Sequence, residues 1–177
     1  MGRLKLVEPA REHEAQVMAY RETFLRNNDS FDGCSGLEDV ETYEEWLDFE
    51  SRLSAKYGKG YVPSTTYLAI RTEDQKVVGI IDYRHELSDP LLQFGGHIGY
   101  SVLPSERGRG YAKEMLRLLI EKCRDAGADK LLLTCDKKNT ASARTITGNG
   151  GILENEVEDA AETGKSRVIQ RYWIKMK

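Results

Sequence analysis

Apolar positions recur along this chain with a period near two in some segments and near 3.6 in others, and the switches predict its elements. In the first half we expect a short strand, a helix, a turn-rich loop, a second helix and a β-hairpin. Their predicted bounds are Leu4 to Leu6, Glu12 to Leu25 with a close at Asn27-Asn28, Asp29 to Gly36, Asp39 to Gly58, and Thr65 to Arg71 with Lys76 to Leu87. The apolar stripe of the second helix comprises Trp46, Phe49, Leu53 and Tyr57.

The second half begins with a strand, a helix and another strand. They are predicted at His97 to Leu103, Tyr111 to Ala126 and Leu131 to Leu133. A β-α-β unit implies parallel strands with a right-handed crossover. A short helix capped by Asn139 should follow and stop around Gly148 to Gly151. Two closing strands complete the chain, at Ile152 to Val157 and Val168 to Ile174, joined by Asp159 to Lys165. The expected fold is therefore mixed α/β, with a hairpin-rich first half and one parallel crossover.

Composition narrows the class of protein. A chain of 177 residues suits a single domain over 1–177 with its own core. The net charge of −3 disfavours a general nucleic-acid binder. No apolar run reaches transmembrane length, and the N-terminus carries no secretion signal. The three cysteines, Cys34, Cys123 and Cys135, form neither a zinc pattern nor a disulfide framework. We expect a cytoplasmic protein without a metal, a nucleic-acid partner or a membrane partner.

The segment from Pro104 to Ala112 is the strongest functional signal. It leads from a predicted strand into a predicted helix and contains two glycines and two arginines. Backbone N–H groups at a helix start lack intrahelical partners, and the helix dipole adds partial positive charge there. Gly108 and Gly110 let the backbone approach a phosphate, and Arg107 and Arg109 offer charge-assisted bonds. The segment therefore predicts an anion site, although a solvated basic turn would look the same locally.

The type of loop can be narrowed by comparison with known motifs. The chain lacks the GxxxxGK[ST] pattern of a Walker loop, and Gly108-Arg-Gly110 lacks the third glycine of a Rossmann motif. Arg107 to Ala112 instead resembles the R/Q-x-x-G-x-G/A signature of the GNAT superfamily of acetyl-CoA-dependent N-acetyltransferases. Its setting between a strand and a helix, and the later Asn139-x-x-Ser142 and Asn149-Gly-Gly151, follow the order of that family. The resemblance extends over essentially the whole chain.

This resemblance implies a fold, a co-substrate and a set of binding residues. The fold would be a central mixed sheet with splayed strands and helices on both faces. Acetyl-CoA would be the co-substrate, with its pantetheine arm along one strand edge, much as a peptide adds to a sheet. The implied cofactor-binding residues are Ser101, Val102, Leu103, Arg107, Gly108, Arg109, Gly110, Tyr111, Ala112, Asn139 and Ser142. A backbone N–H at a strand bulge near Val102 or Leu103 would stabilise the oxyanion.

The implied reaction is direct attack of an amine on the thioester, which requires a base because an alkylammonium has a pKa near 10.4. His97 is the favoured base, since its position resembles the family's glutamate and imidazole titrates near neutrality. Asp82 is a rival because burial would raise the pKa of its carboxyl. Glu86 is a second rival. Each of these residues could instead have only a structural role.

The general acid departs from the family pattern. Many members carry a tyrosine four residues after the position of Ser142, and Ile146 stands there instead. Tyr172 on the last strand is a substitute candidate, although a core tyrosine is the plainer account. The simplest reading is that the thiolate leaves unaided, since thiol pKa values are near 8.5. Cys135 is expected to be a small buried thiol rather than a covalent intermediate.

The acceptor site is expected between the first two helices and the hairpin. Acidic residues gather there, at Asp29, Asp32, Glu38, Asp39, Glu41, Glu44 and Glu45. Negative potential would attract a cationic small-molecule or peptide amine, but a solvated acidic helix face is the stronger explanation of the cluster, so the acceptor is not named. The missing tyrosine leaves a non-catalytic CoA-binding regulatory module as the alternative function. Dimers are common among relatives, so a homodimer stays open.

Overall fold

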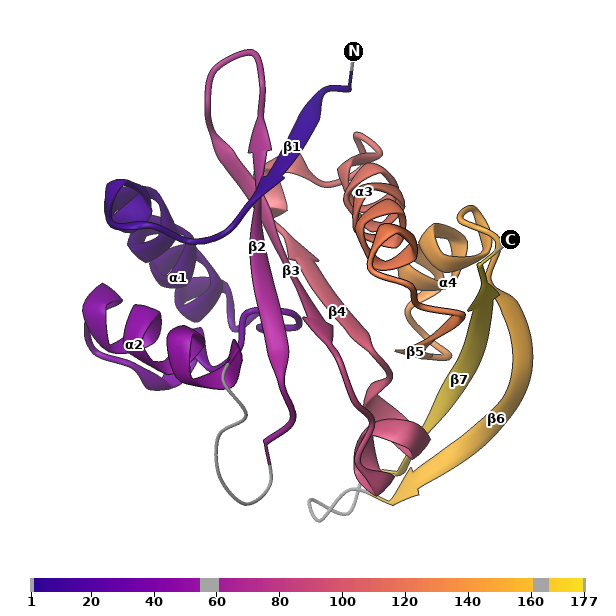
Figure 1. The fold of residues 1–177 in the computed structure, drawn as a ribbon. Helices are drawn as coiled ribbons and strands as arrows, with labels where there is room; N and C mark the ends of the chain where they lie inside the picture. The colour runs from indigo at the N-terminus through magenta and orange to yellow at the C-terminus, as the bar shows by residue number, and fades with distance from the viewer. Residues whose placement is uncertain (1, 55–60, 161–165, 177) are drawn as a thin grey trace.

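The computed structural model describes residues 2–54, 61–160 and 166–176. Figure 1 shows the succession of its elements. The strands are β1 (Leu4–Val7), β2 (Ser64–Arg71), β3 (Val77–Arg84), β4 (Ile98–Val102), β5 (Lys130–Asp136), β6 (Ile152–Ala160) and β7 (Ser166–Lys175). The α-helices are α1 (Glu14–Asn27), α2 (Tyr43–Ser54), α3 (Tyr111–Asp125) and α4 (Thr140–Thr147). Tyr57, Gly58 and most of the predicted 159–165 connection lie outside the described residues.

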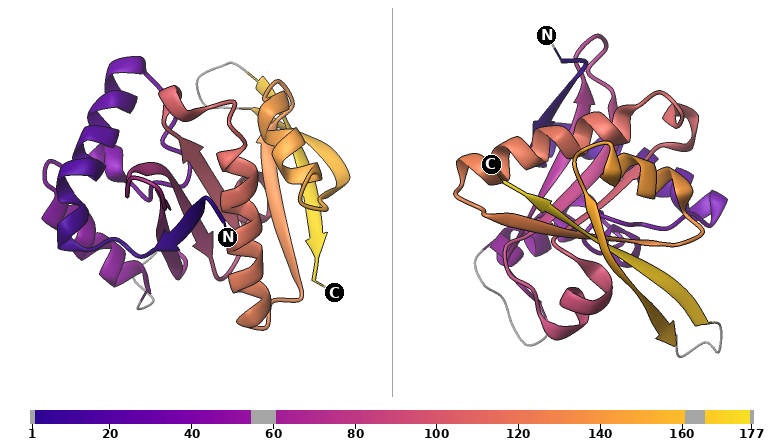
Figure 2. Two further views of the ribbon diagram at one scale, coloured as in Figure 1. Left: turned by 90° about the horizontal axis from the view of Figure 1, so that it is seen from above. Right: turned by 90° about the vertical axis from the view of Figure 1, so that its right-hand side faces the viewer.

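The first sheet has the strand order β1-β2-β3-β4 and is antiparallel throughout. Helices α1 and α2 lie on one side of it and α3 on the other, as Figure 2 shows. Apolar side chains of β2 and β3 therefore feed two cores, with Leu68 and Ile80 in the one under α1 and α2. Ala69 and Ile81 belong to the other core, beneath α3. This period of two is what a strand buried on both faces produces.

The second sheet has the order β5-β7-β6 and is also antiparallel. Helix α3 connects it to β4 and buries one face of its own, which includes Met115, Leu116 and Leu119. Leu131 and Leu133 of β5 join the same core. Helix α3, which follows the predicted anion loop, therefore packs against strands of both sheets.

The main departure from the sequence predictions is at the parallel crossover. The predicted mixed α/β fold with helices on both faces is confirmed. Its strands, however, form two antiparallel sheets rather than one mixed sheet, because β4 and β5 form no ladder. The backbone N–H of His97 donates to the carbonyl of Leu132 at 2.7 Å, just before β4 begins. From that junction the strands separate, which is the splay that the family resemblance implies.

Smaller departures concern element ends. The second strand of the hairpin ends at Arg84 rather than Leu87, and α2 begins at Tyr43 rather than near Asp39. A short π-helix, η3 (Leu91–Gly95), precedes β4 and was not predicted. The close of α1 was predicted correctly, since Asn28 adopts the left-handed conformation that ends the helix.

Candidate active site

The loop before α3 has the geometry of a phosphate cradle. Gly108 and Gly110 have φ angles of 76° and 81°, which L-residues with side chains rarely adopt. No atom lies within 4 Å of the position that a Cβ of Gly108 would occupy, so the backbone there is open to a ligand. Gly110 immediately precedes α3, whose first N–H groups and dipole favour an anion. These residues therefore fit the pyrophosphate that the sequence resemblance implies.

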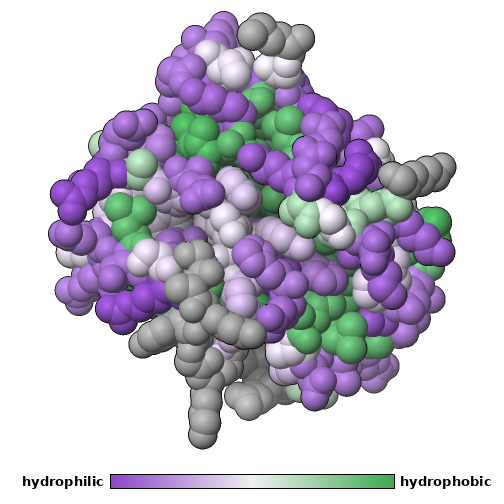
Figure 3. All heavy atoms as spheres, viewed as in Figure 1, coloured by the Kyte–Doolittle hydropathy of each residue, from purple (hydrophilic) through white to green (hydrophobic). Residues whose placement is uncertain are grey.

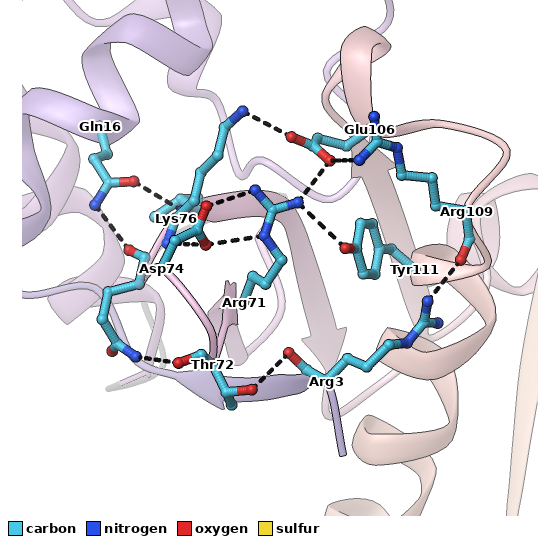
Figure 4. A network of polar contacts seen from close by, with 11 residues as sticks. Arg3, Gln16, Arg71, Thr72, Asp74, Lys76, Glu106, Arg109 and Tyr111 are labelled. Atoms are coloured by element: carbon cyan, nitrogen blue, oxygen red, sulfur yellow. Dashed lines mark hydrogen bonds and ion pairs between the residues drawn. The ribbon is translucent and has the colours of Figure 1, made fainter. Parts of the chain in front are cut away.

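One buried carboxylate organises the cations behind this loop (Figure 4). Glu106 is 4% exposed, and its oxygens lie 2.7 Å from Lys76 Nζ and 2.8 Å from Arg71 Nη1. Arg109 approaches it at 3.4 Å. Hydrogen bonding from Lys76, and then from Arg71, lowers the pKa of Glu106, so it stays ionised. The sequence reading missed Glu106, although a single carboxylate set among the loop's arginines was a usable signal.

The side chains of the loop are held by the protein itself. Arg107 Nε donates to the carbonyl of Val102 at 3.0 Å, and its guanidinium pairs with Asp29 at 3.3 Å. Tyr111 is buried, and its hydroxyl accepts a bond from Arg71 at 3.2 Å. Ala112 packs against the core beneath α3. The Arg107 and Arg109 side chains nevertheless stay 49% and 58% exposed, so the loop can offer a phosphate both its backbone N–H groups and its guanidinium groups.

The three strand residues assigned to the pantetheine arm occupy different environments. The Ser101 hydroxyl is turned towards α1 and lies 2.9 Å from Tyr20 Oη and 3.2 Å from Cys34 Sγ. Val102 faces the opposite core. The oxyanion prediction needs correction at Leu103, because its N–H donates to Val78 at 2.9 Å. The β3–β4 register also runs without a shift, so β4 has no bulge there.

Residues after β5 close the far side of the gap. The Asn139 side chain accepts a bond from Ser142 N–H at 3.1 Å and so caps α4, as predicted. Ile146 is fully buried. Cys135 is also buried, which raises the pKa of its thiol and disfavours the thiolate. Ser142 Oγ lies 2.7 Å from the hydroxyl of Tyr100, a residue that the sequence reading did not single out.

A cavity of about 1030 Å³ lies on the α2 side of the first sheet. It extends from α2 and the preceding loop to β3 and η3, and hydrophilic residues predominate over α1 and α2 in Figure 3. Of the described residues that line it, seven are acidic and two, Arg52 and Arg84, are basic. The acidic ones are Asp32, Glu38, Asp39, Glu41, Glu45, Asp48 and Asp82. Five of the seven acidic residues in the predicted cluster therefore reach one cavity.

Gly33 brings this cavity against β4. Its φ is 76°, and a Cβ there would lie 2.4 Å from the carbonyl oxygen of Gly99. A larger residue could not occupy this position without moving the loop or the strand. The acceptor side and the strand assigned to the thioester are therefore in direct contact.

Asp82 stands at the inner wall of the cavity. It is 4% exposed, and Oδ1 accepts a bond from Gly99 N–H at 2.9 Å. Arg84 Nε lies 3.3 Å from Oδ2. Burial raises the pKa of Asp82, although Arg84 and the Gly99 N–H act in the opposite direction. A carboxylate so placed can accept a proton from an amine in the cavity.

His97 is placed differently. Its Nδ1 accepts a bond of 2.9 Å from the backbone N–H of Leu132, so the proton of the neutral ring lies on Nε2. Burial lowers the pKa of the imidazole and keeps it neutral. His97 is not among the residues that line the acceptor cavity. The lone pair of Nδ1, which a base would need, is therefore occupied by the Leu132 N–H, and this bond links the start of β4 to β5.

The two other predicted candidates lie away from the cavity. Tyr172 is buried, and its hydroxyl donates to Gln170 Oε1 at 2.7 Å on the same strand. Glu86 is exposed and lies beyond the end of β3.

Glu50 is a second carboxyl that the sequence reading missed. It lies on α2 behind the cavity, where the hydroxyls of Ser35 and Thr66 hydrogen-bond to it. Its Oε1 is buried without a hydrogen-bond partner among the described residues. Burial raises the pKa of Glu50 to about 7. Thr66, which hydrogen-bonds to Glu50, is the partner of Asp82 in the β2–β3 ladder. Glu50 and Asp82 therefore both lie next to Thr66.

Comparison with known proteins identifies the class. A family model described as an acetyltransferase (GNAT) domain matches residues 3–152. The chain therefore belongs to the GNAT acetyltransferases, N-acetyltransferases that use acetyl-CoA as co-substrate. No protein among the curated sequences matches the chain.

Solved structures share the fold. RimL, a ribosomal alpha-N-protein acetyltransferase in complex with coenzyme A, is 20% identical, with a TM-score of 0.72 over 99% of this chain and 96% of that one. MccE, a microcin self-immunity acetyltransferase in complex with acetyl-CoA and AMP, is 16% identical, with a TM-score of 0.71 over 99% and 94%. YncA from Salmonella typhimurium, a putative acetyltransferase with acetyl-CoA, is 13% identical, with a TM-score of 0.66 over 99% and 95%.

Within residues 2–54, 61–160 and 166–176, no group of three or more His, Cys, Asp or Glu side chains is arranged to hold a metal ion. No helix in these ranges has the length and apolar character needed to cross a bilayer.

Proposed function

We propose that residues 1–177 form one catalytic domain that transfers the acetyl group of acetyl-CoA to a primary amine of a small molecule or peptide. Acetyl-CoA supplies the activated thioester, and its pyrophosphate would be held by the Gly108–Gly110 backbone at the start of α3. The observation that carries the proposal is the acidic cavity, which meets β4 at Asp82 and Gly33. Donor and acceptor sites thereby adjoin the same strand.

Asp82 is the base in this proposal. It lines the cavity, it is buried, and its pKa is raised, so it can take a proton from the attacking nitrogen near neutrality. The nitrogen then attacks the thioester carbonyl directly. His97 is better suited to fastening β4 against β5, because its Nδ1 lone pair is engaged by Leu132.

The acceptor is a cationic amine. The excess of acidic residues lining the cavity creates a negative potential, which concentrates cations and weakens as salt rises. An acceptor with a second positive charge, such as a diamine or a lysine-rich peptide, should therefore have a lower KM than a monoamine of equal length. The double variant Asp39→Asn/Glu41→Gln should raise the KM for the diamine more than for the monoamine.

Thiol release from acetyl-CoA in the presence of a panel of mono-, di- and polyamines and N-terminal peptides tests the proposal, with calorimetry measuring acetyl-CoA binding in parallel. Saturable turnover supports it. Binding without turnover on any amine would favour the non-catalytic CoA-binding module, for which Ile146 in place of a tyrosine is the supporting observation. Absence of binding would overturn the assignment of the loop.

A further inference from the structure

The space between β4 and β5 opens from a single junction. His97 N–H donates to the Leu132 carbonyl, and Leu132 N–H donates to His97 Nδ1, at 2.7 and 2.9 Å. Tyr100 lies three residues beyond His97, and Cys135 lies three residues beyond Leu132. At about 3.3 Å per residue, both are roughly 10 Å from the junction. They therefore face the separating strands at the same depth.

The Tyr100 side chain reaches across this space. It starts on β4, and its hydroxyl lies 2.7 Å from Ser142 Oγ and 3.4 Å from the Ser142 carbonyl oxygen. Ser142 belongs to α4, which follows β5. The hydroxyl of Thr145 interacts with the phenol from the next turn of α4. The phenol is thus positioned from both sides of the gap that would hold the pantetheine arm.

The charged and titratable groups near Tyr100 leave its proton in place. Burial raises the pKa of Tyr100 to about 12, and the nearby Cys135 thiol and the Asp32 carboxylate act in the same direction. The Ser142 and Thr145 hydroxyls oppose the shift but do not reverse it. The phenol therefore stays protonated at neutral pH and keeps a hydrogen to donate.

Other groups around the gap are less suited to this task. Ile146 has no hydrogen to donate, the Tyr172 hydroxyl is directed to Gln170 at 2.7 Å, and Cys135 is buried. We propose that Tyr100 is the hydrogen-bond donor that stabilises the thiolate leaving group, in a role reached from β4 rather than from α4. This proposal rests on the proposed acetyltransferase function.

A bond forms between the amine nitrogen and the acetyl carbon, and the carbon–sulfur bond breaks, leaving its electron pair on sulfur. Tyr100 turns its O–H from Ser142 to the sulfur and stabilises that charge. The proton lost by the nitrogen passes to Asp82 and then to solvent, and the thiolate takes a proton from solvent. The net products are an amide and a free thiol.

Two variants test the role. Tyr100→Phe should lower kcat by about 10- to 100-fold, the range expected for loss of a hydrogen bond to a charged group, with little change in acetyl-CoA affinity. The control Tyr67→Phe removes a hydroxyl on β2, outside the gap, and should leave kcat unchanged. Incorporation of 3,5-difluorotyrosine at position 100 lowers the phenol pKa, so kcat should fall at an alkaline pH where the wild-type rate is constant. If the Tyr100 phenol had only a structural role, the difluorotyrosine variant would show no such fall of kcat at alkaline pH.

A binding measurement complements the kinetics. The fluorine resonances of the same variant should shift when CoA is added, and should shift less with desulfo-CoA, which lacks the sulfur. Unchanged kcat in Tyr100→Phe, or equal shifts with the two ligands, would overturn the role of Tyr100 while leaving the acetyltransferase intact. Absence of turnover in the wild-type protein would overturn both the role and the proposed function.

Discussion

The Asp82 carboxylate accepts a hydrogen bond of 2.9 Å from the backbone N–H of Gly99, so the proposed base is held against β4, the strand proposed to bind the thioester. Asp82→Asn should lower kcat by about 10²- to 10⁴-fold, because the amide cannot take a proton. Its carbonyl oxygen can still accept the Gly99 bond, so acetyl-CoA affinity should be nearly unchanged. Steady-state kinetics and calorimetry measure the two quantities.

The pH profile sharpens this first prediction. Asp82 must be ionised to act, and burial raises its pKa, so kcat/KM should rise with pH through a value above that of an ordinary aspartate. Asp125→Asn removes an exposed carboxyl at the end of α3 and should leave the profile unchanged. A normal rate and an unshifted acid limb in Asp82→Asn would show that another group is the base.

Glu50 should make stability depend on pH in the direction opposite to a surface salt bridge. Its pKa is about 7 in the folded protein against 4.5 for a free glutamate, so the native state binds the proton more tightly. The stabilisation is full below about pH 4.5 and is lost as pH rises through 7. Glu50→Gln, which is always neutral, should exceed the wild type by up to about 3 kcal/mol at pH 8 and match it at pH 4. Urea unfolding across this range measures the difference, and one that is constant with pH would contradict the prediction.

Glu106 should stabilise both the loop and the fold. Glu106→Gln leaves Arg71 and Lys76 without their buried carboxylate, so the free energy of unfolding should fall by about 3 kcal/mol at pH 7. Because the folded-state pKa is lowered, this stabilisation exists above the ordinary glutamate pKa and is lost as pH falls. Glu121→Gln breaks an exposed pair with Arg117 and should cost less than about 1 kcal/mol. Equal losses in the two variants would contradict the special role of Glu106.

Gly108→Ala should separate binding from stability. The φ of 76° imposes a strain of about 1–3 kcal/mol on alanine, and the new methyl would enter the open space proposed for the pyrophosphate. Gly127→Ala is a matched control, since φ is 87°, no atom lies within 4 Å of its Cβ position, and it lies at the far end of α3. Both variants should lose similar stability in thermal unfolding, but only Gly108→Ala should raise the Kd for acetyl-CoA at least tenfold. Equal Kd values would remove the loop from the binding site.

The elements and the loop were predictable because their signals are local. Period-two and period-3.6 patterns located the strands and helices, and Gly108 and Gly110 indicated the positive φ angles of the proposed anion site. The capping of α4 by Asn139 follows from the same local preferences.

The rest depends on partners distant in sequence. Arg107 binds Asp29, which is 78 residues away, and no periodicity reveals that pair. The imidazole of His97 is engaged by a backbone N–H of β5, so its accessibility was invisible in the sequence. Tyr100 shares a strand face with Ile98 and Val102, so the sequence pattern alone indicates a core residue. Only the separation of β4 from β5 places its hydroxyl against Ser142 of α4.

In the proposed enzyme, alternate residues of β4 face the acceptor side and the acyl side. Gly99 and Ser101 face the cavity side and α1, whereas Tyr100 and Val102 face the opposite core and the gap. Substitutions at odd positions should retune which amine is accepted, and substitutions at even positions should retune which acyl thioester is used. Because the strand separates the two proposed sites, the choice of amine and the choice of acyl thioester can change independently within one fold.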